Sequence, residues 1–232
     1  MSSETLHRAD LPFDTSFFKK EKANNKTYTT EEVFQMIYKT NHWKDEFSAS
    51  GNGSNDIQTK TIKKALPKLL NEYSIKTMLD LPCGDFYWLS RLNLGIEKYI
   101  GGDIVKEIIE KNTSLYGDEN KEFMIMNLIS DDLPSADIIF CRDCLVHLSH
   151  EDIIKSIRNI KRTKIKFLLT TTFTNRTVNE DIITGDWRIL NLEKAPFNFP
   201  KPIIIINENC NEGNGSYSDK SLGLWSVSQI DL

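Results

Sequence analysis

The sequence predicts an α/β protein: a mostly parallel sheet of seven strands, with helices on both faces and an antiparallel hairpin at the C-terminal end. Short apolar segments alternate with helical stretches along the middle of the chain. Continuous apolar runs, as at 138–140 and 167–169, are typical of parallel strands covered on both faces. Only a Gly/Ser/Asn loop at 213–218 separates the last two apolar segments, so we expect them to pair as a hairpin.

The expected elements follow from the spacing of apolar residues. A stripe with helical period predicts a helix over 58–73, which Pro67 should kink or interrupt. Further stripes at 108–109 and 153–160 predict helices between strands. The expected strands are 77–81, 99–103, 123–127, 137–141, 167–173, 203–207 and 222–227.

The chain divides into three parts. Residues 1–30 are polar and weakly patterned, so we expect a flexible arm or a linker from a larger polypeptide. Residues 31–54 begin as a helix, because Thr29 and Glu32 have the spacing of a capping box, and end in a Gly/Ser-rich loop. That loop is either a simple linker or a lid over a ligand. Residues 55–232 form the core domain.

Composition limits the class of protein. The chain has 232 residues, a net charge of −4 and 39% hydrophobic residues, which is ordinary for a globular protein and argues against a dedicated nucleic-acid binder. No apolar run reaches the roughly 20 residues of a membrane span, and we expect no secretory signal. Cys83, Cys141 and Cys144 fall at or beside strand ends, which indicates reduced thiols in the cytoplasm. Cys141 and Cys144 lack a second pair, so no metal site is expected.

Two strand ends carry the strongest functional signal. The first expected strand contains Asp80 and turns at Pro82-Cys83-Gly84, and the next ends at Asp103. A strand, a tight turn that lets backbone approach a ligand, and a second strand ending in an acid is the arrangement that binds a nucleoside. The spacing Gly-x-Gly-x-x-Gly of dinucleotide-binding enzymes is absent, which disfavours an NAD-dependent dehydrogenase.

The order of elements and these strand ends resemble the Rossmann-like class I S-adenosylmethionine (SAM)-dependent methyltransferases, from about residue 45 onward. Three strings, at 79–88, 141–148 and 222–225, together resemble a subgroup of small bacterial and viral methyltransferases. Members of that subgroup are often found beside, or fused to, glycosyltransferases. In the family's first motif, Pro82 and Phe86 replace the first and third glycines, so the turn should differ in detail.

The resemblance implies SAM as cofactor and a set of contacts. Backbone near the first turn would lie at the methionine and ribose with Asp80 beneath it, Asp103 would bind the ribose hydroxyls, and the carbonyl of Cys141 would approach the amino group. Other residues would pack on adenine or close over the cofactor. The implied cofactor-binding residues are Trp43, Ser54, Asp80, Leu81, Pro82, Cys83, Gly84, Asp103, Ile104, Asn127, Leu128 and Cys141.

The methyl end of such a site would be formed after the fourth strand. Asp143 and His147 lie there, and on a helix their spacing would place both on one face, where an Asp–His couple could take the proton of an alcohol. The loop after the fifth strand combines aromatic and charged residues that suit a sugar ring. Its candidates for substrate binding are Phe173, Arg176, Asp186, Trp187 and Arg188. A metal-assisted alternative would need Asp143, Asp181 and Asp186 to converge.

Several functions stay open. The first is O-methylation of a sugar hydroxyl of a glycan or glycoconjugate, with a fused or associated glycosyltransferase as partner. The second is methylation of a non-sugar small molecule or of a protein carboxylate. The third is a non-catalytic SAM-binding module of a glycan-assembly protein.

Overall fold

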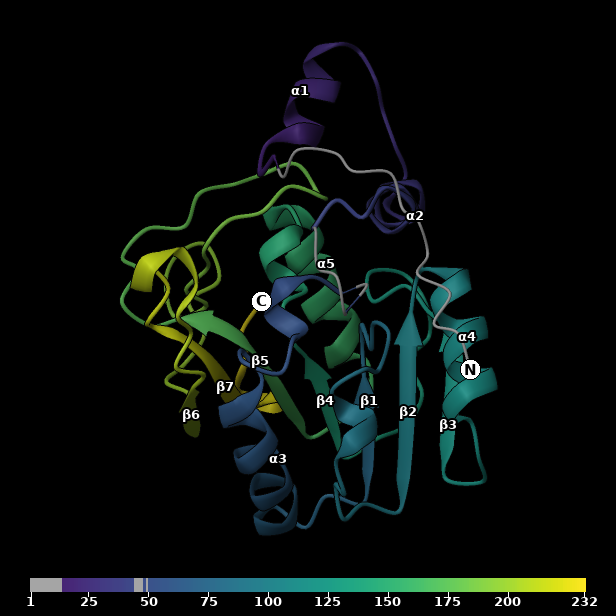
Figure 1. Ribbon diagram of the computed structural model, residues 1–232. Coiled ribbons are helices and arrows are strands. Elements are labelled where there is room, and N and C mark those ends of the chain that lie inside the picture. Colours follow the sequence, from purple (N-terminus) through teal and green to yellow (C-terminus); the bar gives the residue numbers. More distant parts are fainter. Residues whose placement is uncertain (1–13, 44–47, 49) are drawn as a thin grey trace.

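The computed structural model describes residues 14–43, 48 and 50–232. Its core is one seven-stranded sheet in the order β3-β2-β1-β4-β5-β7-β6 (Figure 1). The strands from β3 to β5 pair in parallel, and β7 runs antiparallel to both β5 and β6. The strands are β1 (Thr77–Asp80), β2 (Lys98–Asp103), β3 (Lys121–Ile125), β4 (Ile138–Cys141), β5 (Phe167–Phe173), β6 (Ile204–Asn207) and β7 (Lys220–Ser226). The predicted fold, including the C-terminal hairpin, is confirmed.

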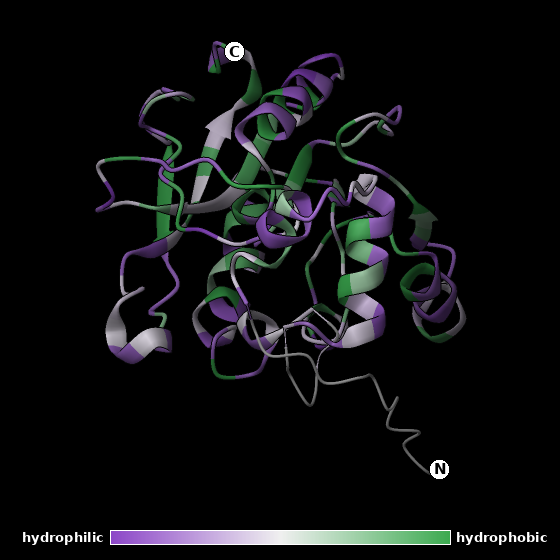
Figure 2. Ribbon diagram, turned by 90° about the horizontal axis from the view of Figure 1, so that it is seen from above, coloured by the Kyte–Doolittle hydropathy of each residue, from purple (hydrophilic) through white to green (hydrophobic). Residues whose placement is uncertain are grey.

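Three helices cover the sheet on its two faces. Apolar residues of α3 (Lys60–Glu72) and α4 (Lys106–Tyr116) share a core cluster with Met78 of β1, whereas those of α5 (His150–Lys161) pack with Leu79. Successive residues of β1 therefore point to opposite faces, as the pleat of a strand requires. Figure 2 shows the apolar strands lying between these helices.

The prediction that Pro67 interrupts its helix is wrong. Helix α3 runs without a break from Lys60 to Glu72 with Pro67 inside it. Proline removes one backbone hydrogen bond, but Leu66, Leu69 and Leu70 around it are all buried against the sheet. Burial of this apolar face outweighs the local penalty.

The N-terminal part of the described chain is packed onto the domain. Helix α2 (Thr30–Thr40) begins with the predicted capping box, in which the Thr29 hydroxyl accepts from the Glu32 N–H and the Glu32 carboxylate from the Thr29 N–H. Helix α1 (Phe17–Ala23) was not expected from the sequence. Residues 1–13 of the expected arm lie outside the described residues, but the rest includes α1, whose Phe18 is buried with Val33 and Ile37.

The N-terminal helices lie beyond the carboxyl ends of the parallel strands (Figure 1). Short 3-10 helices connect the larger elements: η1 (Asn52–Ser54), η2 (Leu89–Arg91), η3 (Leu145–His147), η4 (Glu212–Gly215) and η5 (Val227–Gln229). None of the helices in the described part of the chain combines the length and apolarity that crossing a bilayer requires.

Candidate active site

The turn after β1 is in close contact with Ser50. Gly84 has φ +53°, and a Cβ there would lie 2.0 Å from the hydroxyl oxygen of Ser50. Phe86, at the position of a family glycine, takes φ +56°, a left-handed conformation that favours glycine. Its buried ring packs against Tyr99 and Phe123, both with centroids about 5 Å away, and this packing holds the unusual backbone in place.

The Gly/Ser-rich loop of residues 50–54 folds over this turn. The backbone N–H of Asp85 donates to the Ser50 hydroxyl (3.2 Å), and the Ser48 hydroxyl donates to the Asp85 carboxylate (3.2 Å). On the other side, the Arg142 guanidinium donates to the Gly53 carbonyl (2.8 Å). The loop is thereby tied both to the β1 turn and to the end of β4, as a lid over a ligand would be.

A first cavity lies at the carboxyl ends of β1, β2 and β4. Its volume is about 1080 Å³, part of which is open to solvent. Eleven of the twelve residues predicted to bind cofactor line it: Trp43, Ser54, Asp80, Leu81, Pro82, Cys83, Gly84, Asp103, Ile104, Asn127 and Leu128. Cys141 does not line it. That residue is fully buried in β4, and its carbonyl accepts a hydrogen bond from the Thr170 hydroxyl (2.6 Å).

Two buried carboxyl groups mark this cavity. Asp103 accepts the N–H of Gly84 at one oxygen (3.1 Å) and the N–H of Val105 at the other (2.9 Å). Burial raises the pKa of Asp103 to about 6 despite these hydrogen bonds. Asp80 accepts the hydroxyl of Tyr99 (2.6 Å), and burial raises the pKa of Asp80 to about 8. At pH 7, Asp103 is therefore mainly ionised and Asp80 mainly protonated.

The amide of Asn127 is partly engaged by the backbone. Its side-chain oxygen accepts the N–H of Ile129 (2.9 Å), and its own backbone N–H donates to Asp131 (2.8 Å). A carbonyl oxygen has two lone pairs, so one acceptor position of Asn127 remains.

A second cavity opens beside the first. Its lining combines the loop at 50–53, three aromatic side chains (Phe173, Trp187 and Tyr217) and the charged residues Glu212 and Lys220. Four residues line both cavities: Trp43, Ser50, Asp143 and His147. The two cavities thus meet at Asp143 and His147.

His147 is buried and its ring is oriented by backbone. Its Nδ1 lies 3.0 Å from the carbonyl oxygen of Asp186. A carbonyl only accepts, so Nδ1 carries the proton and Nε2 is left as a hydrogen-bond acceptor. Burial lowers the pKa of His147 to about 4, and the imidazole is neutral at pH 7.

The expectation that one helix carries both Asp143 and His147 is wrong. His147 lies in the 3-10 helix η3, and Asp143 precedes it with φ +52°, outside any helix. The Asp143 carboxylate instead pairs with Lys220 Nζ (2.7 Å) and with Arg142 (3.2 Å), and these cations hold the pKa of Asp143 well below its usual range although burial opposes them. The interaction of Asp143 with His147 is therefore electrostatic and acts through space.

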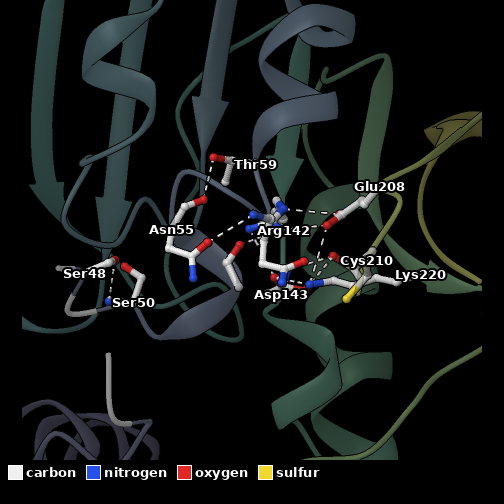
Figure 3. A network of polar contacts seen from close by, with 12 residues as sticks. Ser48, Ser50, Asn55, Thr59, Arg142, Asp143, Glu208, Cys210 and Lys220 are labelled. Carbon is white, nitrogen blue, oxygen red and sulfur yellow. Dashed lines mark hydrogen bonds and ion pairs between the residues drawn. The ribbon is translucent and has the colours of Figure 1, made fainter. Parts of the chain in front are cut away.

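Four charged side chains form a network behind the junction, three of them buried (Arg142, Glu208 and Lys220) and Asp143 half-buried (Figure 3). Arg142 binds Glu208 through two nitrogens (3.2 and 2.7 Å), and Lys220 lies 3.6 Å from the same carboxylate. Sequence reasoning missed Glu208 and Lys220, which come from two separate strand ends. The sequence did show a charged residue at the edge of a buried strand, which could have signalled such a site. It did not show which residues would meet there, because Lys220 is placed by the long-range pairing of β7 with β5, in which it lies opposite Phe173.

The predicted substrate residues separate into two groups. Phe173 and Trp187 line the second cavity, joined by Tyr217, whose ring centroid is 5.2 Å from that of Trp187. The charged candidates do not line it, because each binds backbone elsewhere. Arg176 donates to the Ser216 carbonyl, Asp186 accepts from N–H groups of α1, and Arg188 donates to the Leu145 and Leu148 carbonyls.

The aspartates of the metal-assisted alternative do not converge. Asp143 pairs with Lys220, Asp186 binds α1, and Asp181 accepts the N–H of His150. Within the described residues, no group of three or more His, Cys, Asp or Glu side chains has metal-binding geometry.

The strand order, the antiparallel β7 and the cavity at the strand ends define the Rossmann-like fold of class I methyltransferases. No family model and no curated protein matches the sequence. Solved structures match the fold. Human N-acetylserotonin methyltransferase in complex with SAM has 14% identity and a TM-score of 0.57, and the match covers 86% of this chain and 60% of that one. The [4+2]-cyclase SpnF has 16% identity and a TM-score of 0.52, with 72% and 70% covered.

A bacterial methyltransferase domain, CtHen1-C, has 16% identity and a TM-score of 0.44, with 50% of this chain and 66% of that one covered. The chain therefore spans less than two thirds of the lengths of the human enzyme and of this bacterial domain.

Proposed function

We propose that this protein is a SAM-dependent methyltransferase that methylates a hydroxyl group of a sugar or glycan. One observation carries the proposal: a nucleoside-type cavity at the strand ends meets a second, aromatic-lined cavity at a neutral, buried histidine. The fold alone does not decide the reaction, since a [4+2]-cyclase shares it.

The first cavity suits a cationic nucleoside cofactor. Among the described residues that line it, four are aspartates (Asp80, Asp85, Asp103 and Asp143), of which Asp80 is mainly protonated at pH 7, and Arg142 is the single Lys or Arg. Such a cavity disfavours the pyrophosphate of a dinucleotide and favours a sulfonium. Asp103 accepts backbone N–H groups through both oxygens, and its remaining acceptor capacity is available for ribose hydroxyls. Ile104 and Leu128 supply apolar walls for adenine, and the remaining lone pair of Asn127 suits its amino group.

When bound, SAM supplies an activated methyl group on its sulfonium. The protein's own part is to place the acceptor, exclude water and receive a proton. His147 is well placed to receive that proton, because its Nδ1–H is held by the Asp186 carbonyl and its Nε2 can accept from an attacking hydroxyl. Asp143 stays ionised beside it and stabilises the imidazolium that forms.

The second cavity supports a sugar acceptor. Trp187, Tyr217 and Phe173 form one continuous aromatic wall, on which the C–H face of a sugar ring can pack. Asn52, Glu212 and Lys220 supply hydrogen-bonding groups for its hydroxyls. The three strings that resemble glycosyltransferase-associated methyltransferases favour a glycosyltransferase as partner. The four free cysteines support a reducing compartment, the cytoplasm.

The test is transfer of label from methyl-labelled SAM to a panel of sugars and oligosaccharides, with carboxylate-bearing peptides and amines in parallel. Label on a sugar hydroxyl is the expected result. Label only on carboxylates or amines would refute the proposed sugar acceptor, but it would support a methyltransferase that acts on another substrate. Tight SAM binding without transfer to any acceptor would instead favour a SAM-binding module.

A further inference from the structure

A short segment, residues 184–188, joins the 3-10 helix that carries His147 to the N-terminal helix α1. On one side, the N–H of Gly185 donates to the His147 carbonyl (2.8 Å) and the N–H of Arg188 to the Val146 carbonyl (3.1 Å). On the other side, the N–H of Trp187 donates to the Thr15 carbonyl (3.2 Å). The segment is thus fixed to both neighbours by backbone hydrogen bonds.

Asp186, at the centre of this segment, contacts both neighbours at once. Its carboxylate is buried, with 2% of the residue exposed, and accepts the N–H of Phe18 (2.8 Å) and of Lys19 (3.0 Å) at the start of α1. Its carbonyl accepts the Nδ1–H of His147 (3.0 Å). The residue that docks α1 is therefore also the one that orients the imidazole.

Gly185, in the same segment, is closely packed against side chains of α1 and α2. Its φ is +104°, and a Cβ there would lie 2.5 Å from side-chain atoms of both Phe18 and Val33. Phe18 in turn is 2% exposed. Because hydrogen bonds from Phe18 and Lys19 to Asp186, and from Trp187 to Thr15, attach this closely packed segment to α1, we expect undocking of α1 to shift the backbone at 185–186 and with it the acceptor of His147.

We propose that Asp186 is a positioning residue for His147: by docking helix α1, it holds its own carbonyl against Nδ1 and so keeps Nε2 of His147 unprotonated at the junction of the two cavities. The inference rests on the proposed role of His147 as base. It makes the N-terminal helix part of the active site, and it gives Asp186, predicted to bind substrate, a different role.

The direct readout is the tautomer of His147, measured by ¹⁵N NMR on the full chain without cofactor. The Trp43 ring and the Asp186 carbonyl contact the His147 ring, and Asp143, Arg188 and His42 act on it electrostatically. Two variants undock α1 independently, Asp186→Ala and Phe18→Ala. Asp186→Asn is the conservative variant, because its amide oxygen can still accept one of the two N–H groups.

Asp137→Ala is the matched control. The Asp137 carboxylate also accepts two backbone N–H groups, from Lys76 (2.9 Å) and Thr77 (3.0 Å), but it lies just before β4, at the opposite end of that strand from the cavities. Its loss should lower the Tm without changing the tautomer of His147.

Wild-type protein should show the Nδ1–H form, and both undocked variants a mixture with the Nε2–H form. In the transfer assay, kcat should fall about 10- to 100-fold in these variants while the Kd for SAM stays within about threefold, because a misplaced base costs rate rather than binding. Asp186→Asn should fall between them and wild type.

An unchanged tautomer in both Asp186→Ala and Phe18→Ala, or the same change in Asp137→Ala, would overturn the inference. The tautomer readout does not depend on turnover. If the tautomer shifts as expected but wild-type protein transfers no methyl group, the proposed function fails and the positioning role of Asp186 stands.

Discussion

The indole ring of Trp43 lies against the imidazole of His147, with 4.7 Å between the ring centroids and 32° between the planes. Both residues line both cavities. An aromatic face beside an imidazole favours its protonated form, which a base acquires when it takes a proton. The N-terminal segment therefore contributes to the electrostatics of His147 as well as to the wall of the site.

Replacing His147 with Ala should separate chemistry from binding. SAM affinity should change little, since Asp103 and the adenine walls are untouched, while turnover should fall by about 10²–10⁴-fold. Calorimetry for binding and labelled methyl transfer for turnover measure the two effects. His150→Ala is the control, because this nearby histidine packs on Phe197 and lines neither cavity. Turnover that survives in His147→Ala would show that the base lies elsewhere.

Asp103→Asn should weaken SAM binding. The variant loses charge-assisted hydrogen bonds of about 1.5–3 kcal/mol each, so two ribose contacts correspond to a loss of about 100-fold or more. Asp118→Asn, at an exposed carboxylate before β3, is the control. Unchanged affinity in Asp103→Asn would refute the ribose assignment.

The affinity of wild-type protein for SAM should also depend on pH. The pKa of Asp103 is about 6, and its ionised form is the one that accepts from both hydroxyls. Affinity should therefore fall by about tenfold per pH unit below that value. Calorimetry between pH 5 and 8 measures this, and Asp103→Asn should lose the dependence.

Asp80→Asn should stabilise the protein at alkaline pH. The pKa of Asp80 is raised by burial from 3.8 to about 8, so the folded state binds this proton more tightly than the unfolded state. The stabilisation from that proton is lost as pH rises from about 4 to about 8. The Tm of Asp80→Asn relative to wild type should therefore increase between pH 5 and 9.

Asp137→Asn provides a contrast of opposite sign. Burial raises the pKa of Asp137, but hydrogen bonds from Thr77 and Lys76 outweigh it and hold the pKa below its usual value. This carboxylate stabilises the fold above its unfolded pKa. Asp137→Asn should therefore be less stable than wild type at pH 7, with a deficit that shrinks in acid. A parallel pH response of the two variants would contradict both assignments.

Lys220→Met should destabilise the fold strongly. In the described part of the chain it leaves Asp143 and Glu208 with Arg142 as their remaining cation in a buried site, and breaking such a network costs about 3–5 kcal/mol. Combining it with Asp143→Asn restores the charge balance, so the double variant should be more stable than Lys220→Met alone. Urea unfolding of the two single variants and the double variant measures this coupling. Additive losses would show that the pair is not coupled.

Local patterns were sufficient to predict the sheet and the first cavity. Asp80 and Asp103 close apolar runs, and parallel strand ends meet at one edge of a sheet, so their proximity follows from the sequence. The hairpin of β6 and β7 follows from its loop. Helix α2 follows from its capping box.

Contacts between distant segments could not be predicted in this way. Lys220 reaches Asp143 only through the register of β7 on β5. Asp186 is a residue type that can bind sugar hydroxyls, but its carboxylate accepts backbone N–H groups of α1 instead. Helix α1 is far away in the sequence, and its residues show little periodic pattern. Pro67 shows the same limit, because tertiary packing overrides a local rule there.

A crystal structure of the protein with S-adenosylhomocysteine would test the proposed cofactor site most directly. We expect ribose hydroxyls within hydrogen-bond distance of the Asp103 carboxylate, and a sulfur atom directed to the junction at Asp143 and His147. A ligand outside the first cavity, or one whose sulfur points away from His147, would contradict the proposed site.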